Sequence, residues 1–125
     1  MSVPQIIAEA RAIEGGLIAT IPNEWMQGRT SYGGLSAALA LEAARRLADD
    51  LPPLRSATIG FVGPLAGEVT VRARMLRRGR NASWVTAQVS GEAGVGLVAT
   101  FVFMGPVASE LHINDVPPPA GWGSP

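Results

Sequence analysis

The sequence predicts an α+β fold in which a curved antiparallel sheet wraps around one long central helix. The helix is indicated by the run after Gly33 and Gly34, where leucine and alanine occupy nearly every side as far as Ala44. A helix without a polar face is stable only within a large core or within the curl of a sheet. The sheet is indicated by β-prone runs after the helix, joined by short glycine-containing turns, a pattern typical of antiparallel strands.

The elements are expected in the following order. Residues 17–21 form a short β-prone run that ends at Pro22, and a polar loop follows over residues 23–30. The helix begins at the glycine pair and stops near residue 51, because Pro52 and Pro53 cannot continue it. Further β runs complete the domain, at residues 56–62, 69–75, 84–89 and 97–103.

The pattern of each β run predicts its surroundings. Residues 69–75 and 84–89 alternate apolar and polar side chains, which indicates one buried face and one face in water. Residues 97–103 are apolar on both faces, so we expect a central strand that is covered on each side. The alternative fold, a small antiparallel barrel with the helix as a lid, needs a polar face that the first half of the helix lacks.

Composition excludes several classes of function. Ten acidic residues balance ten basic residues, so the basic surface of a general nucleic-acid binder is not expected. Without cysteine and with His112 as the single histidine, the chain offers neither a thiolate nucleophile nor an ordinary zinc site. The apolar runs are too short to span a bilayer, and Glu9 and Arg11 interrupt the region where a signal peptide needs an apolar core. We therefore expect a cytoplasmic protein that uses no metal.

The glycine pair is the first candidate site. Backbone N–H groups at the start of a helix have no partner within the helix and carry the positive end of its dipole. Because Gly33 and Gly34 have no side chain, the carbonyl group of a ligand can approach these N–H groups closely. The alternative is a tight turn at which only glycine fits.

Several segments together resemble a known family. They are Tyr32-Gly33-Gly34 with the alanine-rich helix, Leu54-Arg55-Ser56 with Phe61 and Pro64, the segment Leu76-Arg77-Arg78-Gly79-Arg80, and residues 99–103. Over residues 25–103, their order and spacing resemble the N-terminal half of the bacterial acyl-CoA thioesterase II family, whose members have the hotdog fold. The resemblance implies a single hotdog domain over residues 1–110 and a proline-rich tail or linker over residues 111–125 that leads toward a second hotdog unit. It also implies an acyl-CoA substrate, with coenzyme A as part of that substrate and no separate cofactor.

The resemblance leaves the general base open. The acid, hydroxyl and amide groups of this family lie mainly in the second unit, whereas single-unit thioesterases place an acid on the helix about two turns beyond the second glycine. That position is Leu41 in this chain. Glu42 is the neighbouring candidate for a catalytic carboxylate, although the offset of one residue turns its side chain by about 100°. Alternatively, Glu42 forms an ion pair with Arg46 one turn later.

The resemblance also implies roles for other residues. The N–H group of Gly34 would hydrogen-bond the thioester oxygen and stabilise the oxyanion that forms during hydrolysis. Arg78, Arg80 and Asn81 would contact the phosphates of coenzyme A, or would simply form a solvated turn. The remaining substrate-binding candidates are Trp25, Gln27, Arg29, Thr30, Tyr32 and Gly33, with packing against the helix end as the alternative for Trp25.

Two functions from different classes remain. The first is a thioesterase that binds and, as part of an assembly, hydrolyses acyl-CoA thioesters with a base from a second hotdog unit. The second is a non-catalytic module that binds acyl-CoA or only supplies half of an interface. Both imply a homo-oligomer such as a dimer, or pairing with a second hotdog unit, because the monomer would expose apolar surface.

Overall fold

In the computed structural model, the described residues are 1–27, 30–31 and 33–105, and the side chains of residues 27, 30 and 31 are not described. The helices are α1 (Val3–Glu9), the short 3₁₀ helix η1 (Asn23–Trp25) and α2 (Gly33–Arg45). The strands are β1 (Arg11–Ile13), β2 (Gly16–Ile21), β3 (Met26–Gln27), β4 (Thr30–Ser31), β5 (Leu54–Phe61), β6 (Gly67–Arg78), β7 (Ala82–Gly91) and β8 (Gly94–Met104). Within these residues, no helix combines the length and apolarity needed to cross a membrane.

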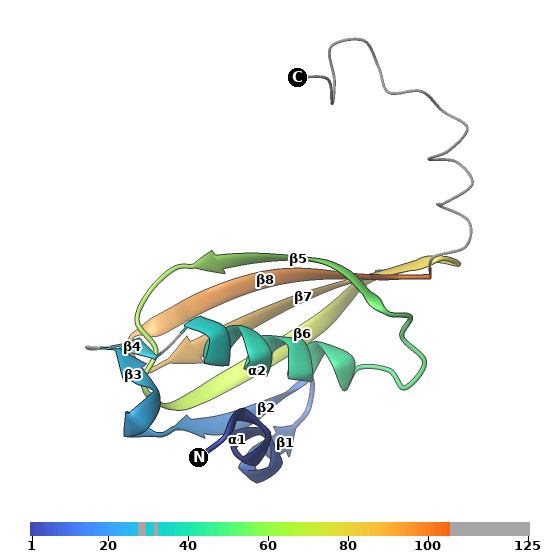
Figure 1. The fold of residues 1–125 in the computed structure, drawn as a ribbon. Coiled ribbons are helices and arrows are strands. Elements are labelled where there is room, and N and C mark those ends of the chain that lie inside the picture. Colours follow the sequence, from blue (N-terminus) through green and yellow to red (C-terminus); the bar gives the residue numbers. More distant parts are fainter. Residues whose placement is uncertain (28–29, 32, 106–125) are drawn as a thin grey trace, which may run out of the picture.

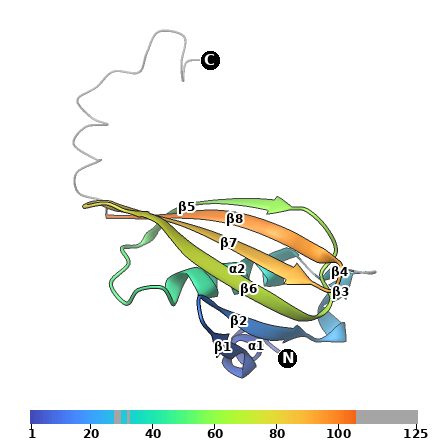
Figure 2. The same cartoon turned by 180° about the vertical axis from the view of Figure 1, so that it is seen from behind.

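The main sheet is antiparallel and has the strand order β1-β2-β6-β7-β8-β5. Strands β6, β7 and β8 follow one another in sequence and in space, β2 joins beside β6, and β5 joins beside β8 as the edge strand. The sheet curves, and α2 lies across one of its faces (Figure 1, Figure 2). The predicted α+β fold, a curved antiparallel sheet around one long helix, is confirmed.

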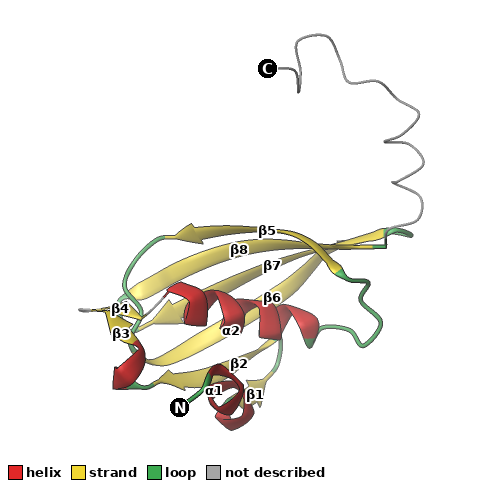
Figure 3. Ribbon diagram, in the orientation of Figure 1, coloured by secondary structure: helices red, strands yellow, loops and turns green. Residues whose placement is uncertain are grey.

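Helix α2 buries one side of its surface against the sheet (Figure 3). The buried residues recur with the helical period: Leu35, Ser36, Leu39, Ala40, Ala43 and Ala44. Alanine on this side lets the backbones approach closely, and the inward-facing side chains of β6, β7 and β8 fill the core beneath it. The opposite side of the helix, with Ala37, Ala38 and Leu41, stays half-buried. The sheet therefore wraps one side of the apolar helix rather than its whole circumference.

The prediction for β8 is wrong in one respect. The strand is second from the edge rather than central, and the described residues leave its outer face partly exposed. Leu97 and Phe103 are fully buried on the α2 side, whereas Val98 on the outer face is 39% exposed. Val102, also on the outer face, is largely covered where it pairs with Trp84 of β7.

Helix α2 ends at Arg45, earlier than the predicted end near residue 51. The N–H of Leu47 donates to the carbonyl of Ala44 at 3.2 Å, which closes a final turn. Continuing the helix would place the carboxylates of Asp49 and Asp50 at the negative end of its dipole, and Asp50 instead binds Arg78. The two prolines therefore set a limit for the helix but not its end.

The first part of the chain contains more structure than predicted. The segment expected as a loop over residues 23–30 contains η1 and most of a small antiparallel sheet, in which Met26 of β3 pairs with Ser31 of β4. Helix α1 was not predicted, although Ser2 and Gln5 form a capping box: the Gln5 N–H donates to the Ser2 hydroxyl at 3.3 Å and the Ser2 N–H donates to Gln5 Oε1 at 2.7 Å. Ile6 of this helix is 2% exposed and belongs to the core.

Candidate functional site

The start of α2 lies at the surface beside the end of β5. Gly34 is exposed and Gly33 is half-buried. A Cβ atom on Gly33 would lie 2.9 Å from Cε1 and 3.0 Å from Cζ of Phe61, so the aromatic ring packs directly on the Gly33 backbone. Because Phe61 is 67% exposed, this contact is at the surface and not in the core. The exposed Phe61 ring therefore lies over the Gly33 backbone, and the exposed Gly34 remains the candidate N–H donor.

The connection between β5 and β6 holds Phe61 in this place. The N–H groups of Val62 and Gly63 both donate to the carbonyl oxygen of Gly96, at 2.8 and 3.2 Å. Leu65, 3% exposed, fills the space over Gly96, where an added Cβ would lie only 2.3 Å from Leu65 Cγ. The segment that follows Phe61 is thus tied to β8 by hydrogen bonds and by packing.

The residues predicted to line the mouth of an acyl site are only partly described. Arg29 and Tyr32 lie outside the described residues, as do the side chains of Gln27 and Thr30. Trp25 is half-buried in η1, and its indole Nε1–H donates to the carbonyl of Met1 at 2.7 Å. Trp25 therefore packs against the N-terminal segment, and its contact with an acyl chain stays a prediction.

Glu42 has a partner on its own helix. Its carboxylate Oε2 accepts a hydrogen bond from Arg46 Nε at 2.7 Å, which is the ion pair that the spacing suggested. Leu41, at the position of the acid in single-unit thioesterases, is apolar and half-buried. Helix α2 therefore supplies no unpaired carboxylate for a general base.

The arginine-rich turn lies at the other end of the sheet. Phe61 pairs with Leu97 on β8 and is level with Val71 on β6 through Val89 of β7. Arg78 lies further along β6, which places it roughly 20 Å from that level along the strand. Arg80 and Asn81 follow in the exposed turn beyond it. One chain therefore does not bring the arginine-rich turn next to the glycine pair.

Arg78 also forms an ion pair with a carboxylate. Its Nη2 donates to Oδ1 of Asp50 at 2.5 Å, which links the loop after α2 to the end of β6. The hydrogen bond from Arg78 and its positive charge lower the pKa of Asp50 below the ordinary value of 3.8. A phosphate group that bound Arg78 would have to compete with this exposed ion pair.

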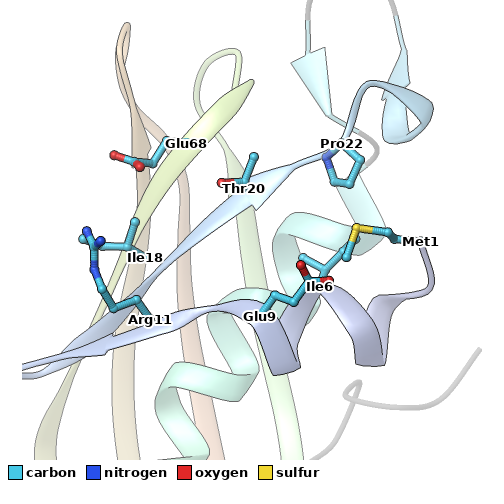
Figure 4. Close-up of a pocket in the computed structure, with 8 residues that line it drawn as sticks. All are labelled: Met1, Ile6, Glu9, Arg11, Ile18, Thr20, Pro22 and Glu68. Atoms are coloured by element: carbon cyan, nitrogen blue, oxygen red, sulfur yellow. The ribbon is translucent and has the colours of Figure 1, made fainter.

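Two surface hollows lie elsewhere. One, of about 370 Å³, lies between α1, β1, β2 and the start of β6 (Figure 4) and is lined by Met1, Ile6, Glu9, Arg11, Ile18, Thr20, Pro22 and Glu68. The other, of about 430 Å³, lies over β6 and β7 and is lined by Gly15, Arg72, Ala73, Arg74, Thr86, Ala87 and Gln88. None of the predicted site residues that the structure fully describes lines these two hollows.

Phe61 and the edge of β5 are not among the site residues that the sequence predicts. An aromatic residue directly before Val62-Gly63-Pro64 is a visible signal for the end of a strand. Its contact with Gly33 joins segments that are distant in sequence, and local patterns do not reveal such pairs.

Comparison with known proteins supports this fold and adds a family. A family model described as the acyl-CoA thioesterase N-terminal domain matches residues 21–104. No curated protein matched the chain.

Several solved structures superpose on this fold. A candidate thioesterase II from Thermobifida fusca superposes with a TM-score of 0.72 at 21% identity, over 83% of this chain and 39% of that one. A protein of unknown function with a hotdog fold from Alicyclobacillus acidocaldarius gives a TM-score of 0.72 at 22% identity, over 96% of this chain and 47% of that one. A Bacillus halodurans protein solved with CoA gives 0.63 at 18% identity, over 72% of this chain and 66% of that one. The chain spans less than half the length of the first two structures.

The structural matches establish the architecture, and the family model covers most of the 125 residues, from the end of β2 to the end of β8. The chain therefore has the hotdog fold and belongs to the acyl-CoA thioesterase N-terminal domain family.

Proposed function

We propose that this chain is an acyl-CoA-binding hotdog unit that hydrolyses acyl-CoA thioesters when it is assembled with a second hotdog unit. The observation that carries the proposal is the exposed, glycine-led start of α2 in a chain of this family. The similar Bacillus halodurans structure contains CoA, which supports the same class of ligand for this chain.

In the proposed mechanism, the thioester oxygen accepts a hydrogen bond from the N–H of Gly34. Water attacks the thioester carbon, and the negative charge that develops on the oxygen is stabilised by this N–H and by the positive end of the helix dipole. A base accepts the proton of the attacking water, and the coenzyme A thiolate leaves. The base comes from outside this unit, because Glu42 is paired with Arg46 and Leu41 is apolar.

The edge strand β5 supports the need for a second unit. Among the described residues it pairs with β8 alone, and it contains no proline and one charged residue, Arg55. An edge strand of this kind presents unpaired N–H and C=O groups and few of the features that prevent pairing with another strand. Since Phe61 ends β5 and touches Gly33, a strand added to β5 would bring new side chains next to the glycine pair.

The side of α2 that faces away from the core supports the same assembly. Ala37, Ala38 and Leu41 are only half-buried, and Ala57 on the α2 side of β5 is exposed. A second hotdog unit that extends the sheet at β5 would cover both surfaces. Two copies of this chain related by a twofold axis, or a longer protein with two units, would satisfy this geometry.

The second candidate function is a non-catalytic module that binds acyl-CoA. The absence of an acid at Leu41 favours it for the isolated chain. The two functions differ in one measurable respect, because the module binds acyl-CoA without releasing the free thiol.

The test is a thiol-release assay with acyl-CoA esters of increasing chain length, with the mass of the assembly measured on the same preparation. Gly34→Val keeps the backbone N–H but places a branched side chain beside it, which should hold the thioester oxygen out of hydrogen-bond reach. In the active assembly this change should lower kcat about a hundredfold or more, as expected when one oxyanion contact of about 3 kcal/mol is lost. The matched control is Ala8→Val, which places the same side chain at an exposed position of α1. Circular dichroism should show both variants folded. Unchanged turnover in Gly34→Val would contradict the role of this N–H, and binding of acyl-CoA without thiol release would favour the non-catalytic module.

A further inference from the structure

We propose that the outer face of β6 and β7 binds the phosphate group of a small molecule. The site is the hollow of about 430 Å³ lined by Gly15, Arg72, Ala73, Arg74, Thr86, Ala87 and Gln88. It lies on the face of the sheet that points away from α2, because the alternate residues Val71 and Ala87 point into the core. The proposal is independent of the proposed thioesterase function.

The strand register places four polar side chains around the hollow. Arg72 pairs with Gln88, and Arg74 pairs with Thr86. Since side chains alternate along a strand, Arg72 and Arg74 lie on the same face about 7 Å apart. Ala73 between them packs toward the core, which leaves backbone as the floor of the hollow.

The β1–β2 turn forms a wall of the hollow. Gly15 has a φ of 72°, a conformation that suits glycine, and its carbonyl accepts the N–H of Ala73 at 2.9 Å. The carbonyl of Glu14 accepts a hydrogen bond from Nη1 of Arg72 at 3.4 Å. This contact holds the Arg72 side chain beside the turn while its other N–H donors stay available.

The charges around the hollow favour an anion. Arg72 and Arg74 are exposed, and no carboxylate belongs to the residues that line the hollow. Among residues 1–27, 30–31 and 33–105, the ion pairs found involve Met1, Arg46 and Arg78, so neither Arg72 nor Arg74 is neutralised. Two guanidinium groups balance the charge of a phosphate monoester, the N–H fork of each matches a pair of phosphate oxygens, and Gln88 adds an amide donor.

The test is a titration of the ¹⁵N-labelled full chain with inorganic phosphate, followed by NMR. We expect saturable shifts of the amide signals of Arg72, Arg74, Thr86 and Gln88. Affinity should fall about tenfold in Arg72→Gln and again in Arg74→Gln, since each substitution removes charged hydrogen bonds. The control Arg55→Gln removes an exposed arginine from β5 and should bind phosphate as the original chain does.

A second arm identifies the source of the phosphate group. Coenzyme A that shifts the amide signals of Arg72, Arg74, Thr86 and Gln88 at lower concentration than inorganic phosphate, and weakens in this effect when its 3′-phosphate is missing, would assign the hollow to that ligand. Equal binding of coenzyme A and inorganic phosphate would assign it to free phosphate. Shifts that do not saturate, shifts spread over arginines elsewhere, or equal weakening in Arg55→Gln would overturn the proposal.

Discussion

Gly96 should be a position at which one added methyl group destabilises the segment next to the candidate site. A Cβ on residue 96 would lie 2.3 Å from Cγ and 2.6 Å from Cδ2 of Leu65, and 2.9 Å from the carbonyl oxygen of Gly63. The Leu65 side chain would have to leave the core, or the backbone of residues 62–65 would have to move and strain the hydrogen bonds to the Gly96 carbonyl.

Either response lowers the free energy of unfolding. Exposing a buried leucine costs about 1.5–3 kcal/mol, and overpacking a core that cannot relax costs about 1–3 kcal/mol. We expect Gly96→Ala to lower the free energy of unfolding by about 2–3 kcal/mol, measured by urea denaturation with circular dichroism as the signal. Val95→Ala, at the exposed neighbour, should change it by no more than about 0.5 kcal/mol.

A double-mutant cycle separates the clash from other effects of the added methyl group. Leu65→Ala alone should cost about 2–5 kcal/mol, because it leaves a cavity. Leu65→Ala combined with Gly96→Ala should cost less than the sum of the two single changes, because the smaller side chain leaves room for the methyl group. Additive costs, or a Gly96→Ala variant as stable as the original chain, would refute this account of the contact.

Substitutions elsewhere test the core, the ion pair at the end of β6 and the edge of the sheet. Leu39→Ala removes a fully buried side chain between α2 and the sheet and should lower the free energy of unfolding by about 2–5 kcal/mol, whereas a loss under about 1 kcal/mol would contradict that packing. The pKa of the Asp50 carboxyl, followed by NMR, should lie below 3.8 and return toward it in Arg78→Gln; the stabilising effect of this pair is present above pH 3.8 and is lost as the pH falls through the lowered pKa. Ala57→Glu places a charge on the exposed inner side of β5 and should reduce an assembly to single chains in mass measurements, while an unchanged mass would place the interface elsewhere.

The sheet and the central helix could be predicted because their signals are local. The alternation in β6 and β7 assigned the buried face correctly, and Val85 and Val89 are fully buried. The alanine-rich run gave the helix, and the ion pair of Glu42 with Arg46 followed from helical spacing alone. Each of these features depends on residues that are close in sequence.

The errors arise where distant segments decide the outcome. Beyond the end of α2, Asp50 meets Arg78 across the domain, and Gly33 contacts Phe61 from the far end of β5. For β8, a two-sided apolar pattern does not distinguish a face covered by the chain's own helix from a face left open, as it is at Val98. Helix α1 could have been predicted from local sequence, because Ser2 and Gln5 have the spacing of a capping box.

The strand order has a consequence for synthesis on the ribosome. Helix α2 is made before β6, β7 and β8, the strands against which it packs most. Because synthesis adds roughly 5–20 residues per second, the leucines of this apolar helix stay uncovered for several seconds until the strands of its sheet have been made. The β6–β7–β8 meander forms from neighbouring segments, whereas β2 and β5 have to close long loops to reach it, so these two strands should dock late and limit the folding rate. A nascent chain halted within β7 would therefore be a strong client for chaperones.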